Sequence, residues 1–288
     1  MEQQWPTTTR RVWQVRDGEL QEQETQIVLE EPLSLFVNGQ QVAVLMRLPG
    51  MEKELAAGFS ISEGLVADFA DVLTIRHCGR GLPALDEGVL EEGAEATGDE
   101  SRNEVEVQVR PGGLRPEARL EVVRLIRAGC GAVDVDRAEL PLSPVQNDLT
   151  VDTQVVLRLA QTMAAAQDLH RHVGGVHAAA LFDAQGKLVI LCEDVGRHNA
   201  VDKAVGYCLL RGIPLADKLL LCSGRLSYEM VTKAIRVGLP ILLSMSAPTA
   251  LGVQFADRFG LTIAGYLRGS RMTVYTHPRR LGLGQPTA

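Results

Sequence analysis

The side chains best suited to chemistry crowd into one segment of the second half of the chain, Glu193–Gly206 (EDVGRHNAVDKAVG). Acidic, basic and imidazole groups stand together there at the start of a predicted helix, and the N-terminus of a helix attracts anionic ligands. Arg197 and His198 are therefore candidates for contact with a ligand. Glu193 or Asp194 would fix their orientation or accept hydrogen bonds from a purine or a ribose.

The same segment also has a purely structural interpretation. Asn199 has the type of side chain that caps helices, and Asp202 and Lys203 would form a solvated ion pair in the first turn. Composition alone does not decide between a capping cluster and a ligand site.

Loops rich in Gly, Ser, Thr and Arg follow the predicted strands of the second half. The carboxyl ends of strands in an open α/β sheet meet in one crevice, where backbone N–H groups and helix N-termini bind anions. Ordinary turn chemistry would explain one such loop, but four converging loops favour a ligand that bears phosphate. These loops are Glu193–His198, Ser223–Arg225, Ser244–Thr249 and Arg268–Arg271.

One of the five cysteines, Cys130, stands between glycines in a setting that is not apolar. A thiol on an accessible loop meets two partners in turn, and it reacts as the thiolate, which the nearby Arg124 and Arg127 would favour. An incidental exposed cysteine explains the same pattern equally well. Cys78, beside His77, is a weaker candidate of the same kind.

The other cysteines indicate neither a disulfide framework nor a metal site. Cys192, Cys208 and Cys222 lie in apolar runs typical of buried thiols, and no two cysteines form a CxxC pair. This usage predicts a reducing, cytoplasmic location. His177, in GGVHAAAL, is interpreted as a hydrogen-bonded core residue, and no metal site is predicted, because partners at ligand spacing are missing.

The elements that must position these residues alternate regularly in the second half. Their order predicts a three-layer sandwich, with helices on both faces of a mostly parallel sheet. The helices are expected at Val151–His170, Asn199–Leu210, Leu226–Val237 and Thr249–Phe259, and the strands in GGVHAAALFD, KLVILCEDVG, LADKLLLCSG, PILLSMSA, LTIAGYLRG and MTVYT. A domain boundary near Asn147 divides the chain into residues 1–146 and 147–288.

The first half is expected to be a smaller α+β domain. Asn38-Gly39 lies between two apolar stretches and predicts a hairpin, because both residues tolerate positive φ. Further expectations are a polar lead-in or edge strand at residues 1–25, a helix within 51–66, a solvated acidic loop at Leu82–Glu104, a strand at Val105–Arg110 and a short helix at Ala118–Ala128.

Composition excludes some classes of partner. The net charge is -7, which disfavours a broad nucleic-acid interface. The sequence contains no run of about 18 apolar residues, so no membrane span is predicted. The polar N-terminal stretch does not read as a secretory signal.

Several segments, taken in order, resemble a known family. EDVGRHNAVDK is preceded by GGVHAAAL and followed by SGR, SAPTALGV and GYLRGSRMTVYT, and the first half contributes EEPLSLFVNGQQVAVLMRLPG and KELAAGFSISEGLV. From about Glu30 to about Arg280 the chain strongly resembles the formate dehydrogenase accessory sulfurtransferase family (FdhD/NarQ).

The resemblance implies a C-terminal domain similar to the cytidine deaminase fold, a three-layer α-β-α sandwich. It also implies a sulfur carrier. A cysteine desulfurase hands a persulfide sulfur to a loop cysteine, which delivers it to the bis-molybdopterin guanine dinucleotide form of a molybdenum or tungsten cofactor before insertion into formate dehydrogenase. A GDP-like nucleotide would occupy the same site, and a homodimer fits the family.

By motif, the resemblance assigns the persulfide to Cys130. It assigns the cofactor to Tyr266, Leu267, Arg268, Gly269, Ser270 and Arg271. It extends the pocket to His198, Ser223, Gly224, Arg225 and Ser246.

One position departs from the family pattern. The family has a CGxCG loop, whereas Val133 here takes the place of the second cysteine (CGAVD). A relay through one thiolate survives this change, but a two-cysteine exchange does not. The change leaves open a second interpretation, a cofactor-binding chaperone that transfers no sulfur.

A zinc-dependent deaminase is a further alternative, because it would share the fold. That chemistry needs an HxE and a PCxxC motif. Here His177 is followed by Ala178 and Ala179, and the sequence contains no PCxxC.

Overall fold

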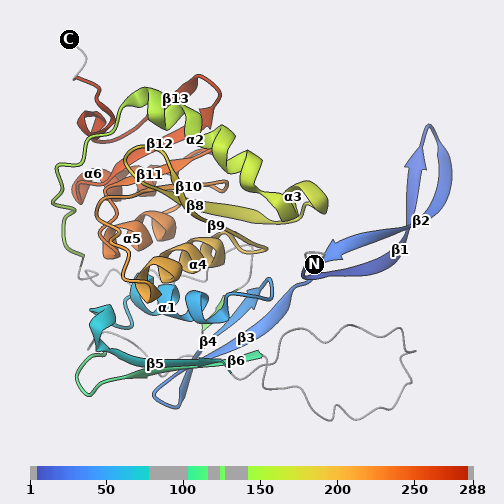
Figure 1. The fold of residues 1–288 in the computed structure, drawn as a ribbon, viewed down its shortest axis with the longest axis horizontal. Helices are drawn as coiled ribbons and strands as arrows, with labels where there is room; N and C mark the ends of the chain where they lie inside the picture. The colour runs from blue at the N-terminus through green and yellow to red at the C-terminus, as the bar shows by residue number, and fades with distance from the viewer. Residues whose placement is uncertain (1–4, 78–102, 116–123, 127–141, 285–288) are drawn as a thin grey trace.

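The computed structural model describes residues 5–77, 103–115, 124–126 and 142–284. The described chain forms a six-stranded sheet, a five-stranded sheet and a separate two-stranded ribbon (Figure 1). In that view the six-stranded sheet lies above and the five-stranded sheet below, with helices between them. The structure is therefore a mixed α/β fold built in layers.

The six-stranded sheet has the order β13-β12-β11-β10-β8-β9. Only β10–β11 and β11–β12 pair in parallel, so the prediction of a mostly parallel sheet is wrong. The reason is local, since short turns join β8 to β9 and β12 to β13, and such turns connect antiparallel strands. The strands are β8 (His177–Phe182), β9 (Leu188–Asp194), β10 (Leu219–Cys222), β11 (Ile241–Ser244), β12 (Thr262–Arg268) and β13 (Arg271–Val274).

Helices cover both faces of this sheet, as predicted. One face packs against α4 (Arg197–Leu210), α5 (Tyr228–Arg236) and α6 (Ala250–Arg258), and the other packs against α2 (Thr153–Ala166). The alternate burial of Ala179 and Leu181 on one face and Ala180 and Phe182 on the other explains why these strands read as continuous apolar runs.

The predicted helix at Val151–His170 is two helices. Asp152 caps α2 by accepting a hydrogen bond from the Gln154 N–H, and the chain leaves helical geometry at Gln167. A short helix, α3 (Asp168–His172), follows. A 3-10 turn, η3 (Pro278–Leu281), closes the described C-terminal part.

The five-stranded sheet has the order β5-β6-β3-β4-β7, and α1 (Glu52–Ser62) packs on it. The predicted hairpin is confirmed, because Asn38 and Gly39 turn with φ of 50° and 79° between β3 and β4. The strands are β3 (Glu31–Val37), β4 (Gln40–Arg47), β5 (Val72–His77), β6 (Glu104–Val109) and β7 (Arg124–Ile126), with a 3-10 turn, η1 (Phe69–Asp71), before β5.

Strand β7 overturns part of a prediction. Residues 118–128 were expected to be helical, but Arg124–Ile126 pairs in parallel with Ala43–Leu45 of β4. A free strand edge offers a run of backbone hydrogen bonds that local helix propensity does not outweigh. Residues 118–123 and 127–128 of the expected helix lie outside the described residues, as does most of the predicted acidic loop.

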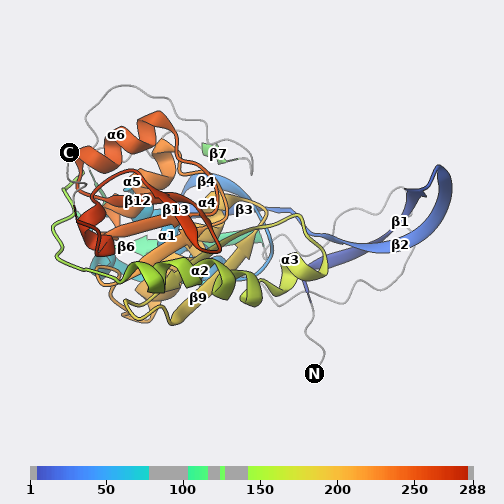
Figure 2. The ribbon, with the colours of Figure 1, turned by 90° about the horizontal axis from the view of Figure 1, so that it is seen from above.

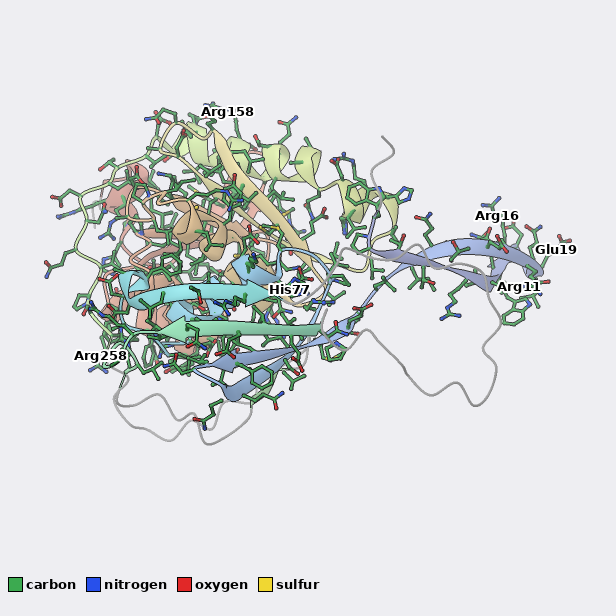
Figure 3. All side chains as sticks on the ribbon, turned by 60° about the horizontal axis from the view of Figure 1, so that its bottom comes forward. Arg11, Arg16, Glu19, His77, Arg158 and Arg258 are labelled. Atoms are coloured by element: carbon green, nitrogen blue, oxygen red, sulfur yellow. The ribbon has the colours of Figure 1, made fainter. Side chains whose placement is uncertain are left out.

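The first strands form a ribbon that projects from the body (Figures 1 and 2). Strands β1 (Thr7–Arg16) and β2 (Glu19–Val28) pair along their whole length, so the part of the predicted lead-in from Thr7 onward is neither frayed nor the edge of a larger sheet. Arg11, Arg16 and Glu19 extend from the ribbon in Figure 3. Apolar side chains are also exposed on it, with Trp13 at 66%.

Helices α1 and α4 lie backbone against backbone and join the two sheets. A Cβ atom on Gly58 would stand 1.9 Å from the Asp202 carbonyl oxygen, and one on Gly206 would stand 1.8 Å from the Glu54 carbonyl oxygen. Only glycine fits at either position. Among the helices of the described residues, none is long and apolar enough to cross a membrane.

Candidate functional site

Three of the predicted loops follow strands that end at the same edge of the six-stranded sheet. We call this edge the open edge. Cys222 is in register with Ala179 of β8 and Ser244 of β11, so the loops after β10 and β11 begin side by side. Ser223 joins β8 directly, because its N–H donates to the Ala178 carbonyl at 2.9 Å and its Oγ accepts from the Ala178 N–H at 3.0 Å.

A chain of hydrogen bonds then connects the predicted pocket walls. The Ser244 hydroxyl donates to the Gly224 carbonyl at 2.6 Å, and the Ser246 N–H donates to Ser244 Oγ at 2.8 Å. The Ser246 carbonyl accepts from the Tyr266 N–H at 2.9 Å. The structure therefore brings together Ser223, Gly224, Ser246 and the start of the Tyr266–Arg271 motif.

Tyr266 has an unusual conformation at this edge. Its φ is 54°, in the left-handed region, and it lies where the β12–β13 register shifts. Nearly half of the residue is exposed. A strained, exposed aromatic residue is typical of functional positions.

The rest of the motif divides into a buried part and an exposed part. Leu267 is fully buried in the core beneath α2, so its side chain is not part of the open edge. Arg268, Gly269, Ser270 and Arg271 form the exposed turn between β12 and β13, and Arg225 is exposed after β10. Three predicted arginines are thus available to a ligand.

His198 is placed beneath the edge rather than on its surface. It is 6% exposed, and its Nε2 lies 3.1 Å from Glu229 Oε2 on α5. The pKa of Glu229 is lowered, mainly by the hydrogen bond from His198. A second hydrogen bond, from Ser227, lowers this pKa further. His198 therefore supports the pocket through α5 more than it reaches into it.

Arg197 and His177 lie against Gly224. A Cβ on Gly224 would stand 3.0 Å from Arg197 Cδ and 3.6 Å from His177 Nδ1. His177 Nδ1 also contacts Ser223 Oγ at 3.2 Å. Burial lowers the pKa of His177, with further lowering by Arg197 and His198 and an opposing effect of Asp194, so the imidazole is neutral at neutral pH.

His177 was expected in the core and is instead a half-buried residue of the open edge. Its hydrogen bonding was predicted correctly. The signal that sequence reasoning passed over is the Gly174-Gly175 pair, both with positive φ, which starts β8 at the same edge as the loops.

Two residues of the segment Glu193–Gly206 have roles that differ from those predicted. Both carboxylate oxygens of Glu193 accept from the first N–H groups of α3, at 3.0 Å from Leu169 and 2.9 Å from His170. The cap residue of α4 is Gly196, so Asn199 is not a cap. Glu193 therefore holds a helix and is not free to orient Arg197 or His198.

The predicted solvated ion pair is also wrong. Asp202 and Lys203 lie in the second turn of α4, because the helix already begins at Arg197. Both are buried, and each pairs with a different partner, Asp202 with Lys233 at 2.8 Å and Lys203 with Asp194 at 2.7 Å.

The described cysteines are unsuited to nucleophilic chemistry. Burial raises the pKa of Cys192 and of Cys222 to about 12 and that of Cys208 to about 11, so these thiols stay protonated at neutral pH. Cys78, Cys130 and Val133 lie outside the described residues. Within the described ranges, no group of three or more His, Cys, Asp or Glu side chains is arranged to bind a metal ion.

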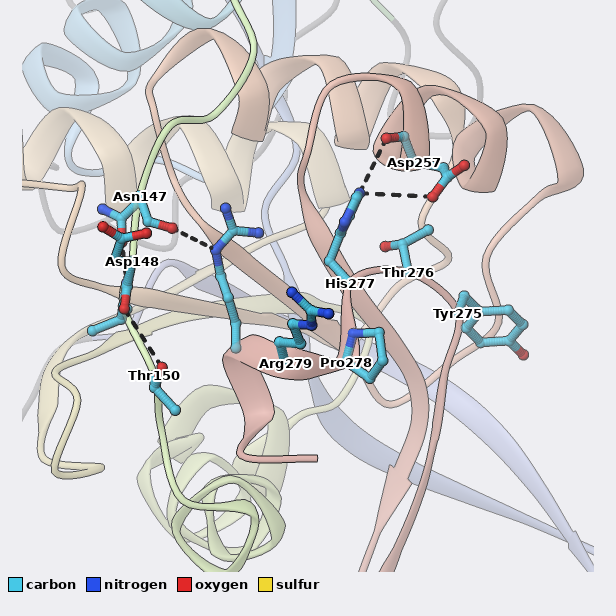
Figure 4. Close-up of a pocket in the computed structure, with 11 residues that line it drawn as sticks. Asn147, Asp148, Thr150, Asp257, Tyr275, Thr276, His277, Pro278 and Arg279 are labelled. Atoms are coloured by element: carbon cyan, nitrogen blue, oxygen red, sulfur yellow. Dashed lines mark hydrogen bonds and ion pairs between the residues drawn. The ribbon is translucent and has the colours of Figure 1, made fainter. Parts of the chain in front are cut away.

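A depression of about 850 Å³ lies away from the open edge (Figure 4). Arg280 on its wall already donates to backbone carbonyls, among them Gly260 at 2.6 Å, and His277 contacts the Asp257 carbonyl at 3.0 Å. None of the predicted site residues lines it. The lining residues are Asn147, Asp148, Leu149, Thr150, Asp257, Tyr275, Thr276, His277, Pro278, Arg279 and Arg280.

Comparison with known proteins identifies relatives along nearly the whole chain. The model of the FdhD/NarQ family matches residues 28–282. Proteins named sulfur carrier protein FdhD are 38% identical in Streptomyces avermitilis, covering 96% of both chains, and 37% identical in Thermoplasma acidophilum, covering 95% of this chain and 93% of the relative. The Mycobacterium tuberculosis protein of that name is 36% identical, covering 96% of this chain and 99% of the relative.

The fold also has a solved counterpart. The crystal structure of a putative formate dehydrogenase accessory protein from Desulfotalea psychrophila aligns with a TM-score of 0.70, covering 96% of this chain and 99% of that one. Its sequence is 24% identical, so this likeness concerns the fold.

Proposed function

The chain belongs to the FdhD/NarQ family, and from that membership we propose that it is a sulfur carrier in the maturation of formate dehydrogenase. The curated relatives are named sulfur carrier proteins, and the structural counterpart is described as a putative formate dehydrogenase accessory protein. The observation that carries the proposal is the meeting of three motif-bearing loops at the open edge, which contain Ser223, Ser246 and the exposed Arg225, Arg268 and Arg271.

The proposed carrier atom is Sγ of Cys130. The three described cysteines are buried with raised pKa values, which leaves Cys78 and Cys130 as candidates. The resemblance to the family's loop motif favours Cys130. In the loading step the Cys130 thiolate attacks the outer sulfur of a persulfide on a cysteine desulfurase. The donor's S–S bond breaks, its cysteine leaves as a thiolate, and the outer sulfur with its proton ends on Cys130.

The proposed acceptor is the molybdenum or tungsten ion of a bis-molybdopterin guanine dinucleotide, bound as substrate. The persulfide loses its proton, and the bond between Cys130 Sγ and the outer sulfur breaks. Cys130 regains its thiolate as the neutral sulfur atom passes to the reduced metal, which supplies the two electrons that make it sulfide.

The open edge has the chemistry to bind the nucleotide part of this substrate. Arg268, Arg271 and Arg225 would pair with the pyrophosphate, and the hydroxyls of Ser223 and Ser246 would add hydrogen bonds. The exposed ring of Tyr266 offers a face for a guanine base. GDP is expected to bind in the same way.

Finer features of the proposal concern the fold and the partners. The C-terminal domain, residues 147–288, is proposed to be similar to the cytidine deaminase fold, beside an N-terminal α+β domain of residues 1–146. The partners would be a cysteine desulfurase and formate dehydrogenase in the cytoplasm, and the chain would pair as a homodimer.

Persulfide labelling tests the proposal. Wild-type protein incubated with a cysteine desulfurase and cysteine should gain one alkylatable persulfide, and Cys130→Ala should gain none, while the Cys78→Ala control keeps the label. Equal labelling of wild type and Cys130→Ala would refute the carrier role.

Val133 favours a second candidate, a chaperone that binds the cofactor without transferring sulfur. In that case wild type would remain unlabelled, while GDP would still raise its melting temperature, because a ligand specific for the native state stabilises it.

A further inference from the structure

The Asp194 side chain is fully buried between the two sheets and accepts from both sides. Its Oδ1 accepts from the Gly196 N–H and from Asn199 Nδ2, each at 2.9 Å. Its Oδ2 lies 2.7 Å from Lys203 Nζ and accepts from the Leu48 N–H at 3.2 Å. One carboxylate therefore links the loop after β9 to the chain after β4.

The partners of Asp194 reach across the same junction. Lys203 Nζ donates to the Leu48 carbonyl at 2.8 Å, and Asn199 Nδ2 donates to the Met46 carbonyl at 2.7 Å. Asp194, Asn199 and Lys203 are called here the β4 clamp. Three side chains of the C-terminal part thus hold the backbone at the end of one strand of the N-terminal sheet.

Each side of the clamp leads to a part of the proposed sulfur transfer. On one side, the loop that Asp194 anchors continues directly into Arg197 and His198 beside the open edge. On the other side, β4 pairs in parallel with β7, and Leu45 is in register with Ile126, four residues before Cys130. The chain that leads to Cys130 and the chain that supports the pocket are fastened to the same end of β4.

We propose that Asp194, Asn199 and Lys203 are positioning residues that fix Arg197 and His198 of the nucleotide pocket relative to the strand pair β4–β7. This inference rests on the proposed function. The clamp touches no substrate. It sets the position of Arg197 beside Gly224 and of His198 beneath the open edge, and it ties both to the sheet that contains β7.

A second buried cluster joins the same two parts and provides a matched control. Lys233 Nζ lies 2.8 Å from Asp202 Oδ2 and 2.7 Å from Glu63 Oε1. The Ser62 hydroxyl donates to Asp202 Oδ1 at 2.6 Å. This cluster fastens the end of α1 to α4 and α5, because the Lys233 ammonium donates to Ser62 and to Asp202.

The experiment compares two double variants that each replace a buried Asp–Lys pair by neutral side chains. In the control, the partly exposed Glu63 also loses its ion pair with Lys233. Asp194→Asn/Lys203→Met removes the β4 clamp, and an amide at position 194 sets a donor against the Leu48 N–H. Asp202→Asn/Lys233→Met is the control. GDP affinity is measured by calorimetry below the melting temperature of both variants.

The clamp variant should bind GDP about tenfold more weakly than wild type, in the range by which positioning residues change coupling between sites. The control should stay within about twofold of wild type even where its melting temperature falls equally. If the clamp variant does not fold, Asn199→Ala replaces it, because it removes the bonds to Met46 and Asp194 and leaves the ion pair.

The outcomes separate the two proposals. Equal GDP affinity in the clamp variant and the control would overturn the positioning role while leaving the nucleotide pocket in place. Failure of wild type to bind GDP would overturn the nucleotide pocket itself, and the positioning role with it.

Discussion

Two polar regions of this molecule differ in what surrounds their charges. In the junction between the sheets, the charged side chains of Asp194, Lys203, Asp202 and Lys233 are each at most 3% exposed and paired. At the open edge, Arg225, Arg268 and Arg271 are exposed. The junction has already satisfied its charges internally, whereas the open edge keeps cationic groups available to a ligand.

The comparison teaches that charge density along a sequence does not identify a site. EDVGRHNAVDKAVG is the most charged motif of the C-terminal part, yet most of its polar side chains serve the junction. Burial of an ion pair adds little net stability, but removing one partner is costly because the other charge stays buried. Such pairs therefore specify how the two parts fit together.

The largest expected effect breaks the junction sterically. Gly206→Ala would place a Cβ 1.8 Å from the Glu54 carbonyl oxygen, and neither helix backbone has room to move away. We expect the free energy of unfolding, measured by urea denaturation, to fall by more than about 4 kcal/mol. Gly284→Ala is the control, since no atom lies within 4 Å of its Cβ position. Wild-type stability of Gly206→Ala would contradict the close contact of α1 and α4.

The next effect breaks the junction electrostatically. Asp194→Ala leaves the ammonium of Lys203 buried without its carboxylate. The free energy of unfolding should fall by about 3–5 kcal/mol. Arg11→Ala breaks an exposed pair with Glu22 on the ribbon and should cost less than about 1 kcal/mol. If the free energy of unfolding falls equally in Asp194→Ala and Arg11→Ala, the buried pair is no more important for stability than the exposed pair.

At the open edge the expected effect is on binding and not on folding. Arg268→Ala and Arg271→Ala should change the free energy of unfolding by less than about 0.5 kcal/mol, because both side chains are exposed. Each should weaken GDP binding about tenfold through loss of a charge-assisted hydrogen bond. The control Arg16→Ala, on the ribbon, should bind GDP with the affinity of the wild type. If Arg268→Ala and Arg271→Ala bind GDP as tightly as this control, the proposed arginine contacts are refuted.

The smallest expected effect is a pH dependence from His177. Burial lowers its pKa in the folded state, so the unfolded state takes up the proton first as pH falls. The free energy of unfolding should therefore decline as pH falls through about 6.5, by at most about 1.4 kcal/mol per pH unit, and level off below the folded-state pKa. In His177→Gln this decline should be smaller, and an unchanged profile would assign it to other groups.

Local signals predicted most elements and the meeting of the loops. Asn38-Gly39 is sufficient to predict its turn, because both residues tolerate positive φ. The run Leu219–Cys222 predicts a buried strand, because all four side chains are apolar. The carboxyl ends of neighbouring parallel strands lie at one edge, so the sequence predicts that the loops of Ser223 and Ser246 come together.

The junction was beyond the reach of local reasoning. Asp194 meets Leu48, which is 146 positions away, and Ser62 meets Asp202 across 140 positions. Nothing in the spacing of Asn199, Asp202 and Lys203 indicates that another helix lies against them. The glycines that permit this approach, Gly58 and Gly206, read in the sequence as weak helix formers rather than as contact points.

The open edge, and not the depression between Asn147 and Arg280, is the proposed binding site for a guanine nucleotide. The most direct test is a crystal structure of this chain with GDP. We expect the pyrophosphate against Arg268 and Arg271, with Ser223 and Ser246 within hydrogen-bond distance of the nucleotide. A nucleotide seated beside His277 and Arg280, or bound nowhere on the molecule, would contradict it.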